Sequence, residues 1–176
     1  MVDWVSKPGK VLRGDQAVQF VEVLEGRPLN EKEKRVVREE GFATAAYYDN
    51  KRIPTFGVGQ TGEYIKKGFK ASFDAHEAMT RRMIPSYDSL PEYLQAELVQ
   101  STYRGDLGFS KTTRKLFNQG KYEAAAKEFL NHDEYKDKNT SPGIKSRIKS
   151  VSDAIRRYGL EQAQKAKAEN GMLLGK

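Results

Sequence analysis

One stretch of the chain, beginning at Asn30, changes its hydrophobic pattern part-way, from the spacing of a helix to the spacing of strands. Asn30 is followed three positions later by Glu33, the arrangement of a capping box at a helix start. Val36, Val37 and Glu40 then recur at the i, i+3 and i+4 spacing that places side chains on one helix face. We therefore predict a helix in which Glu40 leans toward the buried face.

The residues after this helix predict a β-hairpin. Gly41 is a natural helix terminator, and the segment 43–48 that follows is small or aromatic. The polar run 49–52 has the composition of a tight turn, and 53–58 forms a second apolar segment. The pattern thus indicates helix, strand, turn and strand within about thirty residues.

Two carboxylates and a hydroxyl lie where the predicted helix ends, at the predicted turn and in the second predicted strand. Glu40 closes the helix, Asp49 stands nine positions later at the turn, and Thr55 follows after six more. A carboxyl at a helix end among apolar neighbours has its neutral form favoured, whereas one at a polar turn stays ionised. Two acids in unlike environments suit glycoside hydrolysis. Each residue alone also has a structural interpretation: Glu40 as a solvated charge at a helix end, Asp49 as a turn former and Thr55 as an ordinary strand residue. The hypothesis therefore rests on their joint occurrence.

This constellation resembles the phage T4-type lysozyme family. The family motif is Glu-Gly at a helix end, Asp nine residues after the Glu, Thr six after the Asp, and then Gly-x-Gly, and all these spacings are present here. The resemblance implies an α+β lysozyme-like fold, with a small helix-plus-hairpin lobe and a larger, mainly helical lobe around a cleft. We assign 30–158 to this catalytic domain, 1–29 to an N-terminal extension and 159–176 to a basic C-terminal tail.

The resemblance also implies a reaction. It would be hydrolysis of the β-1,4 bond between N-acetylmuramic acid and N-acetylglucosamine in bacterial peptidoglycan, with inversion at the anomeric carbon. By position, Glu40 would be the general acid, Asp49 would orient and activate water, and Thr55 would be its hydroxyl partner. Inversion needs the two carboxyl groups roughly 6.5 to 9.5 Å apart. No cofactor and no metal are implied.

Further site residues are carried over from the family by position. They are Gln60, Thr61, Tyr103, Arg104 and Thr112 as substrate contacts, and Arg147 as a partner of the catalytic Glu. The chain departs from the family at two of these places. The family commonly has His where Gln60 stands, and its Phe-Asn-x-Gly stretch is replaced here by residues 103–106.

A second motif overlaps the first. Gly57, Gly59 and Gly62 fit the dinucleotide fingerprint G-x-G-x-x-G, with Glu77 twenty positions after the first of them. The fingerprint requires a helix opening in the loop and a returning parallel strand, and no β-α-β unit follows. We therefore interpret the glycines as a tight backbone turn that lines a sugar cleft.

Charge favours anionic partners. The chain has a formal net charge of +7. Residues 136–176 contain ten Lys or Arg against four acidic residues. Such a field favours anionic cell-envelope polymers, or nucleic acid, in a salt-dependent way. Most of these cations also fit the solvated face of a helix whose buried stripe runs from Ile144 to Tyr158. We expect peptidoglycan as the partner, no nucleic acid, and a monomer.

Composition excludes several classes of site. There is no cysteine, hence no disulfide framework or thiol nucleophile, and His76 and His132 lack metal-type spacing, so we expect both at the surface or at helix ends. No apolar run is long enough to span a membrane, and the N-terminus lacks the pattern of a signal peptide. We expect a protein made in the host cytoplasm. It would reach the cell wall after release by a separate holin, or on the virion.

Other classes of function stay open at this level. The chain could be a non-catalytic peptidoglycan-binding or virion structural module with a lysozyme fold, or a basic nucleic-acid binder. A lytic transglycosylase would make a 1,6-anhydro product and would not need Asp49. Beyond the motif, apolar periodicity and caps predict further helices. They are 16–24, 72–84, 91–103, 109–118, 122–130, one ending near Tyr158, and a loose one after Gly159.

Overall fold

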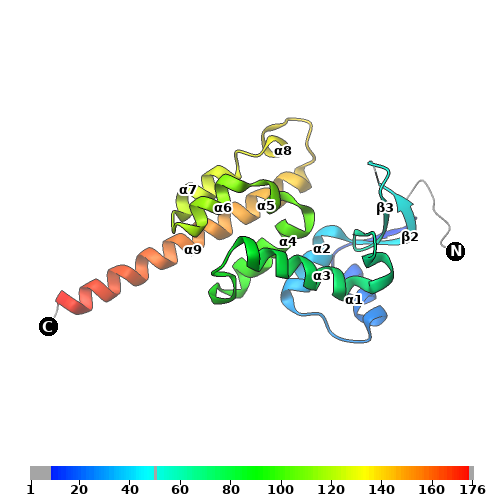
Figure 1. Ribbon diagram of the computed structural model, residues 1–176, viewed down its shortest axis with the longest axis horizontal. Helices are drawn as coiled ribbons and strands as arrows, with labels where there is room; N and C mark the ends of the chain where they lie inside the picture. The colour runs from blue at the N-terminus through cyan, green and yellow to red at the C-terminus, as the bar shows by residue number, and fades with distance from the viewer. Residues whose placement is uncertain (1–8, 50, 175–176) are drawn as a thin grey trace. The chain divides into compact units, whose positions relative to one another are not determined.

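The computed structural model describes residues 9–49 and 51–174, which form two compact units divided between Met79 and Thr80. The first unit combines helices with a small antiparallel sheet, and the second is helical (Figure 1). The α+β class expected from the sequence is thereby confirmed.

The first unit has a four-stranded sheet of order β1-β2-β3-β4, with every neighbouring pair antiparallel. Its elements are β1 (Val11–Leu12), α1 (Gly14–Glu25), α2 (Glu31–Glu40), β2 (Phe42–Tyr48), β3 (Pro54–Gly57), β4 (Gln60–Thr61) and most of α3 (Tyr64–Met83). The predicted order of helix, strand, turn and strand is confirmed. An antiparallel sheet also excludes the β-α-β unit that a dinucleotide fingerprint would need.

Helix α3 differs from its predicted start. The helix expected over 72–84 was to start at a capping Ser72, but Ser72 lies well inside α3 and is buried. The interruption is instead at Gly68, whose φ of 87° and ψ of 175° break the helical path. Phe69 and Phe73, one turn apart, are both buried beyond this break. Packing of these two rings therefore outweighs the local preference of serine for a cap.

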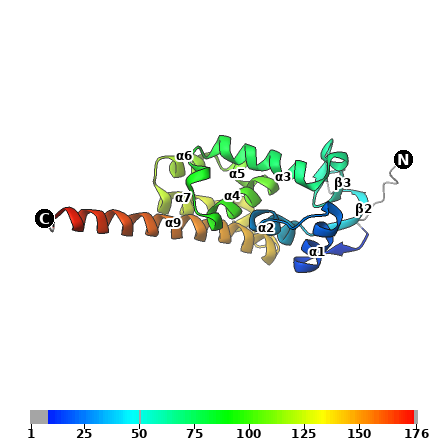
Figure 2. The same cartoon turned by 90° about the horizontal axis from the view of Figure 1, so that it is seen from below.

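The second unit packs its helices against α9, as Figures 1 and 2 show for α7. Its elements are the short 3-10 turn Tyr87–Ser89, α4 (Glu92–Arg104), α5 (Asp106–Phe109), α6 (Lys111–Asn118), α7 (Tyr122–Phe129), α8 (Asp133–Lys136) and α9 (Pro142–Leu174). Its hydrophobic core includes Tyr87, Leu94, Leu98, Phe129, Ile148 and Ile155. The stripe predicted for the helix ending near Tyr158 supplies part of that core.

The helix expected over 109–118 begins two residues later, as α6, and Phe109 ends the separate short helix α5. Ser110 leaves helical geometry at φ −84° and ψ 61°, between α5 and α6. Its hydroxyl donates to the Asp106 carbonyl at 2.8 Å, and its own N–H donates to the same carbonyl at 3.1 Å. A serine side chain that bonds locally competes with helix continuation. Phe109, just before the break, is 86% exposed.

The boundary expected at Gly159 is also wrong, because α9 runs through it without interruption. A Cβ atom at Gly159 would lie 2.7 Å from the Cβ of Tyr122 on α7. The glycine therefore allows two helices to approach closely. Beyond Leu160 the described side chains are mostly exposed, and Figure 1 shows this end of α9 extending past α6 and α7.

This contact predicts opposite effects for two glycines of one helix. Gly159→Ala should destabilise the protein by about 1–2 kcal/mol, because the clash with Tyr122 exceeds the gain in helix propensity. Gly171→Ala is the matched control, since a Cβ there meets nothing within 4 Å, and it should be neutral or stabilising. Denaturant unfolding of both variants tests this. Equal effects of the two substitutions would contradict it.

Candidate active site

Glu40 is the last residue of α2, and the predicted capping box opens that helix. Asn30 Oδ1 accepts from the Glu33 N–H at 2.9 Å, while Glu33 Oε2 accepts from the Asn30 N–H at 2.9 Å. Val36 and Val37 are fully buried, as their spacing predicts, and Glu40 is half-buried. The structure thus places the proposed acid at a helix end beside the core of its unit.

Asp49 organises the turn between β2 and β3. Its Oδ1 accepts from the N–H groups of Lys51 at 2.8 Å and Ile53 at 2.7 Å, and Arg52 adopts a left-handed φ of 59°. Asn50, which we included in the turn, lies outside the described residues. Within the described part of the chain, Oδ2 of Asp49 accepts no hydrogen bond from protein. One oxygen holds the turn, and the other is left for a further donor such as water.

Thr55 lies in a row of residues across the sheet. It is paired with Tyr47 on β2 and with Thr61 on β4, and directly opposed residues share one face of a sheet. Thr55 is buried, and its Oγ1 donates to the Ile53 carbonyl at 2.9 Å. Its hydroxyl oxygen keeps its acceptor capacity. Thr61, at the end of the row, is exposed.

Tyr47 lies within the electrostatic influence of both carboxylates and was missed in the sequence. Burial raises the pKa of its hydroxyl above the usual value, and the negative charges of Asp49 and Glu40 raise it further. The phenol therefore stays neutral within reach of both acids' fields. The sequence did contain a signal for Tyr47, because residues two positions apart in a strand share a face and Tyr47 stands two positions before Asp49. Its pairing with Thr55 could be known only from the register between β2 and β3. Tyr47 is thus paired with Thr55 and experiences the charges of both Glu40 and Asp49.

Gln60 has its amide inside the protein. It is 4% exposed, its Oε1 accepts from the Val58 N–H at 2.8 Å, and its Nε2 donates to the Tyr64 carbonyl at 3.4 Å. Gly57, at φ 62°, lies so close that an added Cβ would be 2.6 Å from Gln60 Oε1. These contacts close the β3–β4 turn around the amide.

The remaining predicted residues belong to the second unit. Tyr103 and Arg104 end α4, Thr112 lies on α6, and Arg147 lies on α9. Thr112 lines a cavity of about 310 Å³ together with Phe109, Ser110, Asn131 and His132. An exposed aromatic ring beside hydroxyl and amide groups is chemistry that suits a sugar or peptide ligand.

Arg104 takes part in a cluster of charges. Its Nε donates to Asp106 Oδ2 at 2.9 Å, its Nη2 pairs with Glu134, and His132 Nε2 lies 3.9 Å from Asp106 Oδ1. Burial raises the pKa of Asp106, and the charge of Arg104 opposes that rise. We expected no metal-type grouping around either histidine. Asp106, His132 and Glu134 do offer ligand atoms within 4.8 Å of one another, but the arginine already supplies positive charge there.

The two histidines differ from one another. His132 precedes α8, so its predicted place at a helix end is confirmed. His76 lies inside α3 and not at a helix end; it is partly exposed, and its Nδ1 is 2.7 Å from the Ser72 carbonyl oxygen. Burial lowers the pKa of His76.

Comparison with protein families decides the affiliation of the chain. The model of the family described as Phage lysozyme matches residues 37–150 of the 176. The chain belongs to the phage lysozyme family. A search of curated proteins gives no match. As a member of this family the protein is a phage peptidoglycan hydrolase in general terms, of the glycoside hydrolase type.

The family match spans every residue that we singled out for the lysozyme site, from Glu40 on α2 to Arg147 on α9. Residues 9–36, which include β1 and α1, precede the match although they are part of the first unit. None of the described helices is long and apolar enough to cross a membrane.

Proposed function

We propose that this phage lysozyme is an endo-N-acetylmuramidase that cleaves the β-1,4 bond between N-acetylmuramic acid and N-acetylglucosamine with inversion. The observation that carries the proposal is the contrast between its two acids. Glu40 stands half-buried at a helix end, whereas Asp49 stands in a polar turn with one oxygen bound to backbone amides. Carboxyl groups in such unlike surroundings can divide the roles of acid and base.

In the proposed reaction, Glu40 donates its proton to the glycosidic oxygen as the bond to the muramic acid C1 breaks. Asp49, through its free oxygen, holds a water molecule and takes its proton as the water oxygen bonds to C1 from the opposite face. Thr55 offers its hydroxyl oxygen to the same water, and Tyr47, paired with Thr55, stays neutral beside the charges of both acids. The products are a reducing-end muramic acid and a free N-acetylglucosamine 4-hydroxyl.

Substrate contacts are proposed on both units. Thr61 extends the exposed end of the Tyr47 and Thr55 row, and Thr112 with Phe109 lines the cavity of the second unit. Tyr103, Arg104 and Arg147 remain candidates from the family motif. Because the amide of Gln60 is buried in its turn, we assign it a supporting role.

Analysis of the products released from purified peptidoglycan tests the reaction. Reducing-end muramic acid in the inverted anomeric form, seen by NMR before mutarotation, would support the proposal. A 1,6-anhydro product would indicate a transglycosylase. Binding of peptidoglycan without release of sugar would favour the alternative, a non-catalytic binding or virion module. An endolysin and a virion-borne enzyme are distinguished by whether purified particles carry the protein.

A basic groove supports a second kind of contact, with anionic cell-envelope polymers. The groove, of about 780 Å³, is lined by Lys138, Lys145 and Lys149 with the hydroxyls of Thr140 and Ser141, and none of the described residues lining it is acidic. Lys149 is paired with Asp153. Lysine ammonium groups on flexible stems suit the phosphate groups of such polymers.

The groove makes wall binding sensitive to salt. The double variant Lys138→Gln/Lys145→Gln should make the log–log dependence of wall affinity on salt shallower by about one to two. The matched control Lys165→Gln/Lys167→Gln removes equal charge from the exposed end of α9 and should leave the dependence unchanged. Co-sedimentation with walls that retain or lack phosphate polymers measures both. Equal effects of the two double variants would argue against the groove as the binding site for these polymers.

A further inference from the structure

The segment before the family match is built into the unit that carries the proposed acid. Strand β1 pairs with β2 directly after α2, with Val11 opposite Ala43 and Leu12 opposite Phe42. Helix α1 packs against α2, and the ring of Phe20 lies 4.9 Å from that of Phe42, centroid to centroid. Residues 11–29 therefore contact both sides of Glu40 along the chain.

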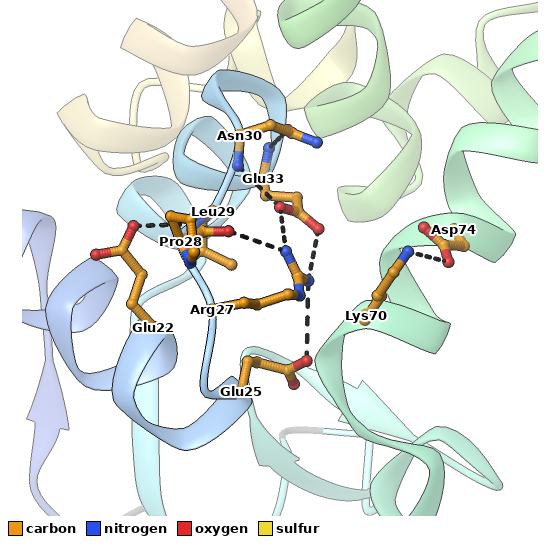
Figure 3. Close-up of polar contacts among 9 residues, drawn as sticks. All are labelled: Glu22, Glu25, Arg27, Pro28, Leu29, Asn30, Glu33, Lys70 and Asp74. Atoms are coloured by element: carbon orange, nitrogen blue, oxygen red, sulfur yellow. Dashed lines mark hydrogen bonds and ion pairs between the residues drawn. The ribbon is translucent and has the colours of Figure 1, made fainter.

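At the N-terminal end of α2, residues 11–29 bind the side chain of Glu33 through Arg27. Arg27 donates from Nη1 to Glu33 Oε2 at 2.9 Å and from Nη2 to Oε1 at 2.8 Å, a bidentate pair (Figure 3). Glu33 is 2% exposed and also completes the capping box with Asn30. Glu22 on α1 accepts from the Leu29 N–H at 2.9 Å. Charge-assisted, two-point contacts of this kind fix geometry as well as adding stability.

At the C-terminal end of α2, the same segment holds the residue that follows the acid. Gly41 has φ 71°, and a Cβ there would lie 2.7 Å from the Leu12 carbonyl oxygen. One turn earlier, Arg38 Nε donates to Asp15 Oδ1 of α1 at 3.0 Å. The backbone of Gly41, directly after Glu40, thus lies closely against β1.

We propose that residues 11–29 form a positioning clamp for Glu40, with Phe20 and Arg27 as its principal positioning residues. The inference rests on the proposed function, in which Glu40 is the acid. The last residue of a helix has no following turn to hold it, and helix ends fray. A general acid needs placement within about 0.5 Å. The clamp fixes α2 at its start through Glu33 and at its end through Gly41 and Phe42.

The test compares Phe20→Ala and Arg27→Gln with wild type on soluble peptidoglycan fragments, at a temperature where every variant is folded. Phe20→Ala, which frees the end next to Glu40, should lower kcat roughly tenfold with KM unchanged, since displacements of about 1 Å cost up to 100-fold. It should also shift the alkaline limb of the pH profile of kcat, which reports the acid. Arg27→Gln should give a smaller loss of kcat, and Arg27→Lys a partial recovery.

Two controls separate positioning from stability. Gly159→Ala destabilises the other unit and should keep wild-type kcat. Arg157→Gln removes a pair with Glu161 and a ring contact with Tyr93, both in the other unit, and should leave kcat, its pH profile and Gly41 exchange unchanged. Hydrogen exchange of the Gly41 N–H, which donates to the Val37 carbonyl at 2.8 Å, measures how firmly the end of α2 is held and does not depend on catalysis. Exchange should be faster in both clamp variants than in wild type.

Two results would each overturn a different claim. If Phe20→Ala and Arg27→Gln keep wild-type kcat, pH profile and Gly41 exchange, the clamp is wrong even though the enzyme works. If wild type and Glu40→Gln release equal sugar, the proposed function is wrong. The exchange measurement then still decides whether residues 11–29 hold the end of α2.

Discussion

Glu40→Gln is expected to abolish peptidoglycan cleavage while leaving the fold intact. Glutamine keeps the size of the side chain at the end of α2 but has no proton to give the leaving oxygen. Loss of a general acid costs about 10²- to 10⁴-fold in rate. Release of reducing sugar from purified peptidoglycan measures the loss, and circular dichroism verifies the fold.

The neighbouring acid provides the control for this substitution. Glu39 belongs to the same helix and pairs with Arg35 one turn away, so Glu39→Gln removes an equal charge from the same helix end. We expect close to wild-type activity from it. If both substitutions reduce activity alike, the effect comes from the charge of the helix end and Glu40 is not the acid.

Asp49 should respond differently to two substitutions, because it has two tasks. Asp49→Asn keeps an oxygen that can accept from Lys51 and Ile53, so the turn should survive while the proposed base is lost. Activity should fall by at least about 100-fold with little change in stability. Asp49→Ala should lose the same activity and, in addition, roughly 1–2 kcal/mol of stability from two unpaired backbone donors.

Paired assays of turnover and thermal unfolding test this split. A transglycosylase or a binding module has no use for the charge of Asp49. Asp49→Asn with full activity would therefore point away from an inverting hydrolase. Equal losses of stability in the two variants would instead show that Asn cannot replace Asp in the turn.

The parts of the first unit that follow from local chemistry were predictable. The capping box of Asn30 and Glu33 and the burial of Val36 and Val37 depend on residues within two turns of one another. The turn at Asp49 likewise depends on its own backbone. Ser72 was misjudged because Phe69 and Phe73, buried on the same helix, extend that helix past it, and tertiary packing overrides a cap preference.

Other features depend on strand register or on how helices pack, which local residue patterns do not determine. The pairing of Tyr47 with Thr55 needs the strand register, and the grouping of Asp106 with His132 needs two helices to meet. Gly159 has the composition of a helix boundary, and only the nearness of Tyr122 shows its role. The spacing of the proposed site residues could therefore be recognised in the sequence, whereas the contacts that support them could not.

The division of the chain at Met79 and Thr80 also bears on how the protein is made. Each unit is drawn from one uninterrupted stretch, so none of its internal contacts waits for a segment from the other. Domains built in this way fold as units, the N-terminal one first, while the ribosome is still adding residues. Glu40, Asp49 and Thr55 would thus take up their places in the nascent chain before the helices of the second unit have been synthesised.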